Sequence, residues 1–192
     1  MLFQELISLV HAQAELIDLN IVIRGSVSIG DIYISEGQVF GPGLVEAYEL
    51  ESKYAKHPRI IIDPQLIYEY KTNKLLKASW HSHEQELEII RDLLRQGDDG
   101  MWFVDYARAL KTELDEPEMY VNFLQRHKEV ILAGAENHKA LNAILAKYIW
   151  MAYYHNRLIS RFNDDWFTHN HITRAKLSIS SADIPTLQYA EL

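Results

Sequence analysis

The most regular part of the chain covers residues 23–63 and reads IRGSVSIGDIYISEGQVFGPGLVEAYELESKYAKHPRIIID. Residues 21–34 are rich in Ile, Val and Ser, which favour a β-strand, and residues 36–37 predict a hairpin turn at Glu-Gly. The tight turn at residues 40–43 leads into an acidic helix, with its proline near the first helical position. Residues 59–62 then predict a short strand that is buried on both faces. The order is therefore strand, hairpin, helix, strand.

Two segments within this stretch carry the motifs of one protein family. Residues 23–30 (IRGSVSIG) match a family strand of the type LRIGIHTG, and residues 44–51 (LVEAYELE) match a family helix of the type VNxAxRLE. The chain thereby resembles the second half of the catalytic domain of class III nucleotide cyclases. The resemblance spans residues 2–63 and is to a divergent bacterial branch, some members of which resemble the pyrimidine cyclases of anti-phage defence. The matching positions are Arg24, Gly30, Gly41, Ala47, Leu50 and Glu51.

The chain departs from the family at the positions that carry its chemistry. Val45 stands where the family has the asparagine that positions the ribose, and Glu49 stands where it has the arginine that stabilises the transferring phosphoryl group. A valine cannot hydrogen-bond a ribose, and a glutamate repels a polyphosphate. Ser26 replaces a family glycine. The metal-binding aspartates belong to the first half of the family domain, for which we expect no counterpart. The resemblance thus predicts no catalytic residue, no metal site and no cofactor, with Mg²⁺ or Mn²⁺ only if a metal-bearing segment completes the domain.

The resemblance predicts an α+β fold with a partial cyclase-like (ferredoxin-like) sheet, followed by a mainly helical C-terminal module. The expected domains are residues 1–70 and 71–192. An incomplete sheet leaves an apolar face and an unpaired edge. C-terminal helices, a second copy of the chain or a segment preceding Met1 could each cover it, and the sequence does not choose between them. We expect a homo-oligomer, because cyclase architectures commonly pair domains.

Outside the resemblance, the sequence mainly predicts helices. Apolar spacing and end signals predict them over residues 2–19, 64–70, 84–96, 116–133 and 136–162, the last being the longest. Residues 101–106 form a short apolar segment that suits a strand or a helix start. One stripe of the longest helix is expected to be packed, and it consists of Leu141, Leu145, Tyr148, Ala152, His155, Ile159 and Phe162.

Composition excludes several classes of protein. The net charge of −8 disfavours nucleic acids and anionic membrane surfaces as partners. The absence of cysteine removes disulfides, thiolate metal sites and cysteine nucleophiles. There is no apolar run long enough for a membrane span, and the acidic N-terminus is unlike a signal peptide. We therefore expect a cytoplasmic protein.

An aromatic run at residues 147–157 (KYIWMAYYHNR) supports two interpretations. In the first, Tyr154 stacks on a base and Arg157 meets a phosphate, which together with Arg24 and Gly41 gives the candidate nucleotide-binding residues. In the second, the aromatic side chains are core packing and His155 is a hydrogen-bonded core histidine.

Clusters of histidine and aspartate are the remaining candidates for chemistry. The first group that could bind a metal is His81, His83, Glu84 and Glu86, to which His169 and His171 could add ligands, and the second is Asp98, Asp99 and Asp105. Neither histidine pair has the helical i, i+4 spacing, and no cysteine supports them. The alternative interpretation is solvated turn residues and a helix cap.

Three functions follow from these observations. The first is a degenerate, cyclase-like module that is non-catalytic and acts by binding, to a nucleotide or a second cyclase-like chain, or by dimerising. The second is a purine or pyrimidine nucleotide cyclase that is active only when a partner or an upstream segment completes it. The third is an unrelated helical interaction protein.

Overall fold

The buried strand predicted at residues 59–62 lies inside a four-stranded sheet within the described residues, which are 2–76 and 82–187 of this computed structural model. Strand β4 (Ile60–Ile62) is at most 5% exposed, because sheet neighbours flank it and helices cover it.

By its internal contacts the chain divides into two compact units. Unit 1 comprises residues 1–13 and 22–109, and unit 2 comprises residues 14–21 and 110–192.

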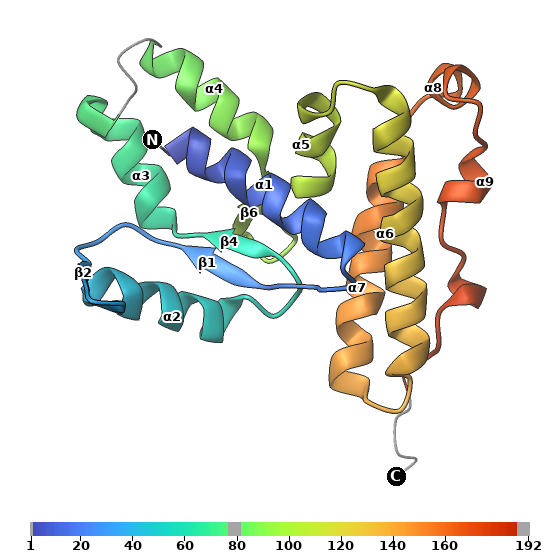
Figure 1. Ribbon diagram of the computed structural model, residues 1–192, viewed down its shortest axis with the longest axis horizontal. Coiled ribbons are helices and arrows are strands. Elements are labelled where there is room, and N and C mark those ends of the chain that lie inside the picture. The colour runs from blue at the N-terminus through green and yellow to red at the C-terminus, as the bar shows by residue number, and fades with distance from the viewer. Residues whose placement is uncertain (1, 77–81, 188–192) are drawn as a thin grey trace. The chain divides into compact units, whose positions relative to one another are not determined.

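Unit 1 is an α+β structure, which confirms the α+β part of the predicted fold class. Its strands pair in the order β1-β4-β6-β5. Strand β1 runs parallel to β4, with Gly25 opposite Ile60, and the other two pairings are antiparallel. Helix α2 lies on one face of the sheet, and α3, α4 and the start of α1 lie on the other (Figure 1). In chain order the elements are α1 (Leu2–Asp18), β1 (Gly25–Val27), β2 (Tyr33–Ser35), β3 (Gln38–Phe40), α2 (Pro42–Tyr54), β4, α3 (Pro64–Thr72), a 3₁₀ turn η1 (Lys74–Leu76), α4 (His83–Leu93), β5 (Leu94–Gln96), β6 (Trp102–Val104) and α5 (Tyr106–Glu113).

The sheet takes strands from both sides of the division expected at residue 70. Strands β1 and β4 precede Tyr70, and β5 and β6 follow it. β6 pairs with β4, so residues 102–104 belong to the same sheet as residues 60–62.

Of two predicted elements, one is divided and the other is shorter in the structure. The strand expected over residues 21–34 is limited to β1 and β2, because the chain turns at Gly30 and the Asp31 carbonyl accepts a hydrogen bond from the Gly43 amide at 3.1 Å. The helix expected over 84–96 ends at Leu93, because Leu94 is extended and starts β5. The backbone N–H and C=O groups of β5 find hydrogen-bond partners in β6, which a longer α4 helix would not provide.

Unit 2 is helical and centres on a pair of helices. It contains α6 (Pro117–Asn137), α7 (Asn142–Ile159), α8 (Asp164–His169), α9 (Arg174–Leu177) and a 3₁₀ turn η2 (Ser181–Asp183). The prediction that residues 136–162 form the longest helix is wrong, because α6 has 21 residues and α7 has 18. His138 ends α6, since its backbone amide and its ring Nδ1 both approach the Gly134 carbonyl, at 3.2 and 2.8 Å.

The predicted stripe of α7 is packed along most of its length. Leu145, His155 and Ile159 are at most 1% exposed, and Ala152 and Phe162 are below 9%. Leu141 is 53% exposed and lies before the helix starts. The prediction that His155 is a core residue is confirmed.

Candidate functional site

Helix α2 carries Val45 and Glu49, the two positions at which the resemblance predicts that catalytic residues are lost. It begins after Gly41, whose φ of +141° is a conformation that favours glycine, with Pro42 in the first turn. Two serines of the β1 segment hold it against the sheet. The Ser26 hydroxyl donates to the Ala47 carbonyl at 2.5 Å, and the Ser28 hydroxyl donates to the Gly43 carbonyl at 2.9 Å. Ser26 therefore positions α2.

The start of α2 also requires two glycines at close approach. A Cβ at Gly30 would lie 2.7 Å from the Gly43 Cα, and a Cβ at Gly43 would lie 2.9 Å from the Gly30 carbonyl carbon. Both distances are too short for a side chain. These glycines bring the base of the β2–β3 hairpin against the first turn of α2.

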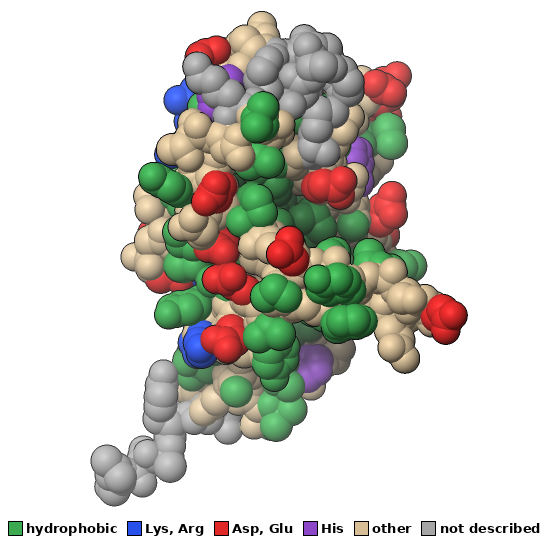
Figure 2. Space-filling model, turned by 90° about the vertical axis from the view of Figure 1, so that its left-hand side faces the viewer, with side chains coloured by type: hydrophobic (Ala, Val, Ile, Leu, Met, Phe, Trp, Pro, Cys, Tyr) green, Lys and Arg blue, Asp and Glu red, His purple; other side chains and the backbone are tan. Residues whose placement is uncertain are grey.

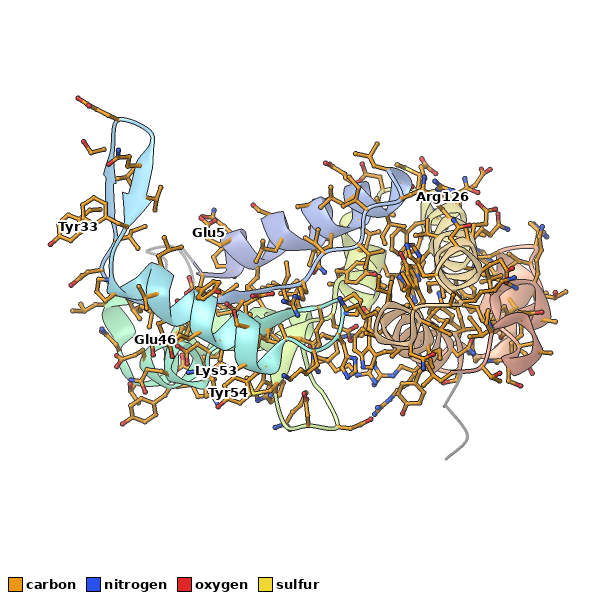
Figure 3. All side chains as sticks on the ribbon, turned by 90° about the horizontal axis from the view of Figure 1, so that it is seen from below. Glu5, Tyr33, Glu46, Lys53, Tyr54 and Arg126 are labelled. Atoms are coloured by element: carbon orange, nitrogen blue, oxygen red, sulfur yellow. The ribbon has the colours of Figure 1, made fainter. Side chains whose placement is uncertain are left out.

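A cavity of about 640 Å³ lies along the open side of α2. Figure 3 shows Glu46, Lys53 and Tyr54 on this side of the helix. Glu46 precedes Lys53 by seven residues and Tyr54 by eight, which is about two helical turns. Val45 and Glu49 also line it, so both predicted positions of lost catalytic residues lie in one cavity. The full lining is Pro42, Val45, Glu46, Glu49, Leu50, Lys53, Tyr54 and Asp63.

The charge of this cavity is acidic. Glu46, Glu49 and Asp63 contribute three carboxylates against the single ammonium of Lys53. The hydrogen bond from Lys53 Nζ to Glu49 at 2.6 Å, together with the charge of Lys53, holds the pKa of Glu49 below its ordinary value. One oxygen of Asp63, which is only 7% exposed, caps α3 by accepting from the Gln65 amide at 2.8 Å. A polyphosphate entering this cavity would meet like charge.

The β2–β3 hairpin is exposed on both of its faces. Tyr33 stacks on Phe40 with ring centroids 5.4 Å apart, and Ile34 lies opposite Val39 in the register. All six residues of the two strands are exposed. An isolated two-stranded hairpin is marginally stable in water, so the exposed apolar pairs on both faces make this hairpin a candidate interaction surface.

The apolar side chains of the hairpin continue onto α2. We call this set the hairpin–α2 surface, and its members are between 45% and 70% exposed. Figure 2 shows hydrophobic side chains gathered with several acidic ones on the side of the molecule where the hairpin and the start of α2 lie. The surface consists of Ile32, Tyr33, Ile34, Val39, Phe40, Leu44, Val45, Tyr48 and Tyr54.

Arg24 and Gly41 are the two candidate nucleotide-binding residues of unit 1. In the structure they hold the two ends of helix α2 in place. Arg24 Nε lies 2.5 Å from a Glu51 carboxylate oxygen, and its Nη1 donates to the Ala55 carbonyl at 3.3 Å. Both partners stand at the end of α2. Gly41 supplies the turn at its beginning, where a Cβ would lie 2.5 Å from the Asp31 carbonyl oxygen.

The two candidates of unit 2 lie on α7. Tyr154 is 2% exposed, and its ring is parallel to that of Trp150 at 5.5 Å and meets the His127 ring edge to face at 6.2 Å. Its faces are therefore occupied by protein. Arg157 is half-buried in the last turn of α7.

The candidate metal ligands within the described residues do not come together at one site. His83 is 8% exposed with Nε2 3.1 Å from the Lys71 carbonyl, whereas His169 and His171 are exposed; His81 lies outside the described residues. Asp99 pairs with Arg59 and Asp105 pairs with Arg108. Over residues 2–76 and 82–187, no group of three or more His, Asp or Glu side chains could hold a metal ion.

Sequence reasoning missed the exposed hairpin and the partner of His155. The segment IYIS–EG–QVF places apolar residues at consecutive positions, so they fall on both faces of a ribbon, and this pattern predicts a hairpin with apolar side chains on both faces. The partner is His127 on α6, which no spacing rule connects to α7.

Comparison with protein-family models, with curated proteins and with solved structures finds no match to this chain, so the function is inferred from the geometry of α2 and the hairpin. Among the helices of the described residues, none is both long and apolar enough to cross a membrane.

Proposed function

We propose that this chain is a non-catalytic module with a nucleotide-cyclase-like scaffold, and that it dimerises with a second copy through the hairpin–α2 surface. The observation that carries the proposal is the hairpin, in which the Tyr33–Phe40 stack and the Ile34–Val39 pair are both exposed. Natural sheets cover or charge such ribbons, and this one carries apolar side chains instead.

The apolar area is suited to a stable interface. Tyr33, Phe40, Tyr48 and Tyr54 are 52–69% exposed, and at 150–250 Å² per aromatic side chain they alone present on the order of 450 Å². The five aliphatic members add to this area. A stable interface buries about 800 Å² per partner, and aromatic residues are enriched at its centre.

The charges on α2 favour a second copy as the partner. Glu46 and Lys53 are seven residues apart, which is two helical turns, so they lie at opposite ends of one helix face. In a two-fold interface residue i meets residue j and j meets i. Antiparallel apposition of two α2 helices along the side that Val45 shares with Glu46 and Lys53 would bring Glu46 of each copy to Lys53 of the other.

The absence of catalysis is argued from the residues on α2. Val45 lacks a hydrogen-bonding group, and Glu49 is a carboxylate held in its charged form by Lys53. Phosphoryl transfer requires positive charge around the transferring group. The acidic cavity supplies the opposite, which supports a binding role over a catalytic one.

The test is the mass in solution, measured by light scattering across a concentration series. We expect a dimer, twice the chain mass of 22.4 kDa. The double variant Tyr33→Ser/Phe40→Ser should be a monomer with an unchanged circular dichroism spectrum, because both side chains are more than half exposed. A monomeric parent chain at high micromolar concentration would overturn the proposal.

Charge exchange tests which partner is used. Glu46→Lys or Lys53→Glu alone places like charges opposite each other twice in a two-fold dimer and should weaken association. The double variant Glu46→Lys/Lys53→Glu restores opposite charges and should recover it. Recovery identifies α2–α2 pairing between copies. Equal association of all three variants and the parent would contradict this arrangement.

A further inference from the structure

A second cavity in unit 1 lies on the opposite face of the sheet from α2. Its volume is about 260 Å³. Leu6 of α1, Ile62 of β4 and Ile90 of α4 form its deep part and are at most 7% exposed. Trp102 of β6 lines its more open part. All the residues that line it belong to unit 1.

The interior of this cavity is apolar because its one deep polar group is already bonded. The Tyr70 hydroxyl donates to the carboxylate of Glu86, and these residues are 3% and 0% exposed. Burial, followed by the hydrogen bond and charge of Glu86, raises the pKa of Tyr70 far above its ordinary value. Tyr70 therefore presents ring carbon to the cavity. The walls of this cavity therefore favour an apolar ligand.

Two cations stand where α3 and α4 border the cavity. Lys71 is exposed at the end of α3, and within the described residues it makes no ion pair. Arg91 is on α4, and the carboxylate nearest to it is Glu88 at 3.7 Å, in a pair that is about two-thirds exposed. Such a surface pair is weak and leaves the guanidinium able to meet a ligand. Two cationic side chains at one apolar cavity are notable in a chain of net charge −8.

We propose that this cavity binds a small amphiphilic carboxylate, with its apolar body between α1, α3 and α4 and its carboxylate at Lys71 and Arg91. The volume sets the size, because 260 Å³ corresponds to about nine water-sized groups at ~30 Å³ each. Octanoate is therefore close to the largest straight-chain carboxylate that fits. The site is independent of the dimer surface, since the two share no lining residue.

The test is calorimetric titration of the full chain with hexanoate, heptanoate, octanoate and decanoate. Each CH₂ buried should tighten binding about fourfold, and the gain should stop once the cavity is full, near eight carbons. Octylamine has the same apolar body and opposite charge, so it should bind at least tenfold more weakly than octanoate. Affinity that does not depend on chain length, or equal binding of octanoate and octylamine, would overturn the proposal.

Variants separate the cavity from the cations. Ile90→Trp fills the cavity and should abolish octanoate binding, while circular dichroism shows that the protein stays folded. If this variant does not fold, Leu87→Trp replaces it, because Leu87 is a half-buried lining residue. Arg91→Glu should weaken octanoate about tenfold, and Lys56→Glu, the same charge change at an exposed residue outside the cavity, should leave it unchanged. Parent-like binding by the filled variant, or equal loss in the Arg91 and Lys56 variants, would contradict the assignment.

Discussion

His127 and His155 face each other inside unit 2, with their Nδ1 atoms 2.9 Å apart and both side chains fully buried. His155 Nε2 lies 2.9 Å from the Leu177 carbonyl, which only accepts hydrogen bonds, so this nitrogen carries the proton. The bare Nδ1 of His155 then accepts from the Nδ1–H of His127. Protonating His155 would set two N–H groups against each other.

The first prediction is that this pair makes the protein less stable in mild acid. Burial lowers the pKa of His155 to about 4, outweighing the Leu177 hydrogen bond, and burial and then the charge of His155 lower that of His127 well below its ordinary value. Between pH 6.5 and 4 the unfolded chain binds protons that the folded chain does not. The contribution of this pair to the free energy of unfolding is therefore complete above about pH 6.5. The titration of His155 alone should lower that free energy by about 3 kcal/mol by pH 4. Urea unfolding across this range measures the slope.

Two variants of His155 serve as controls for this slope. His155→Gln keeps a donor for Leu177 and an acceptor for His127 but cannot titrate, so its unfolding free energy should fall less steeply with acid. His155→Ala should lower stability at pH 7 by roughly 1–3 kcal/mol through a lost hydrogen bond and a cavity. A parent-like slope in His155→Gln would show that other groups cause the acid sensitivity.

The second prediction concerns Gly134, against which the Tyr148 ring packs. A Cβ at Gly134 would overlap that ring, which also stacks on His138 at 5.7 Å. Gly to Ala in a helix interior normally stabilises by about 1 kcal/mol. Here Gly134→Ala should instead destabilise by about 1–2 kcal/mol, because the ring must leave its position. Chemical denaturation measures the difference, and in a Tyr148→Ala background the sign should reverse. The same sign in both backgrounds would refute the packing argument.

The third prediction concerns the pairing of Asp99 with Arg59. Arg59 is 2% exposed, and its guanidinium lies 5.2 Å from the Phe103 ring centroid. Asp99→Asn removes a charge that compensates a buried cation and should lower stability by about 2 kcal/mol at pH 7. Thermal unfolding measures this loss. The control Asp92→Asn, a substitution at an exposed carboxylate, should change the stability of the parent by no more than about 0.5 kcal/mol.

The pH dependence of the same variant gives a second readout. Burial raises the pKa of Asp99, but the hydrogen bond and charge of Arg59 outweigh it and hold the pKa below its ordinary 3.8. The stabilisation is therefore complete above about pH 3.8 and is lost as the pH falls through the lower, folded-state pKa. The difference between parent and Asp99→Asn should narrow only below that pH. A difference that is constant down to pH 2 would mean that the pair does not contribute through its charge.

The fourth prediction is that the purified chain with Mg²⁺ or Mn²⁺ does not cyclise any of the four common nucleoside triphosphates. Glu49 and Val45 provide neither the positive charge nor the hydrogen bond that the reaction requires. Chromatography of the reaction products should show no cyclic nucleotide above a protein-free blank. Cyclic product that is lost in Arg24→Ala would contradict the non-catalytic function, because it would show cyclase activity of the chain on its own.

Local sequence determined those parts of the fold in which one pattern dominates. The run Ile60–Ile62 predicts a strand that is buried on both faces. All three residues are β-branched and apolar, so neither face of the strand carries a polar side chain for solvent. Pro42 after Gly41 started α2, because proline suits the first turn of a helix and glycine the φ before it. His155 was placed in the core by its stripe of apolar neighbours, since a helix face is set by spacing alone.

Tertiary structure decided whatever depended on residues distant in sequence. The segment at Leu94 became a strand because β6 offered it hydrogen bonds, which its own sequence does not encode. The hydrogen-bond partner of His155 lies 28 residues away on α6, and the cation–carboxylate pair of Arg59 and Asp99 spans 40. The same holds for both cavities, because a cavity exists only once several elements pack. Sequence fixes each side chain's chemistry and local face, whereas packing selects which distant groups meet.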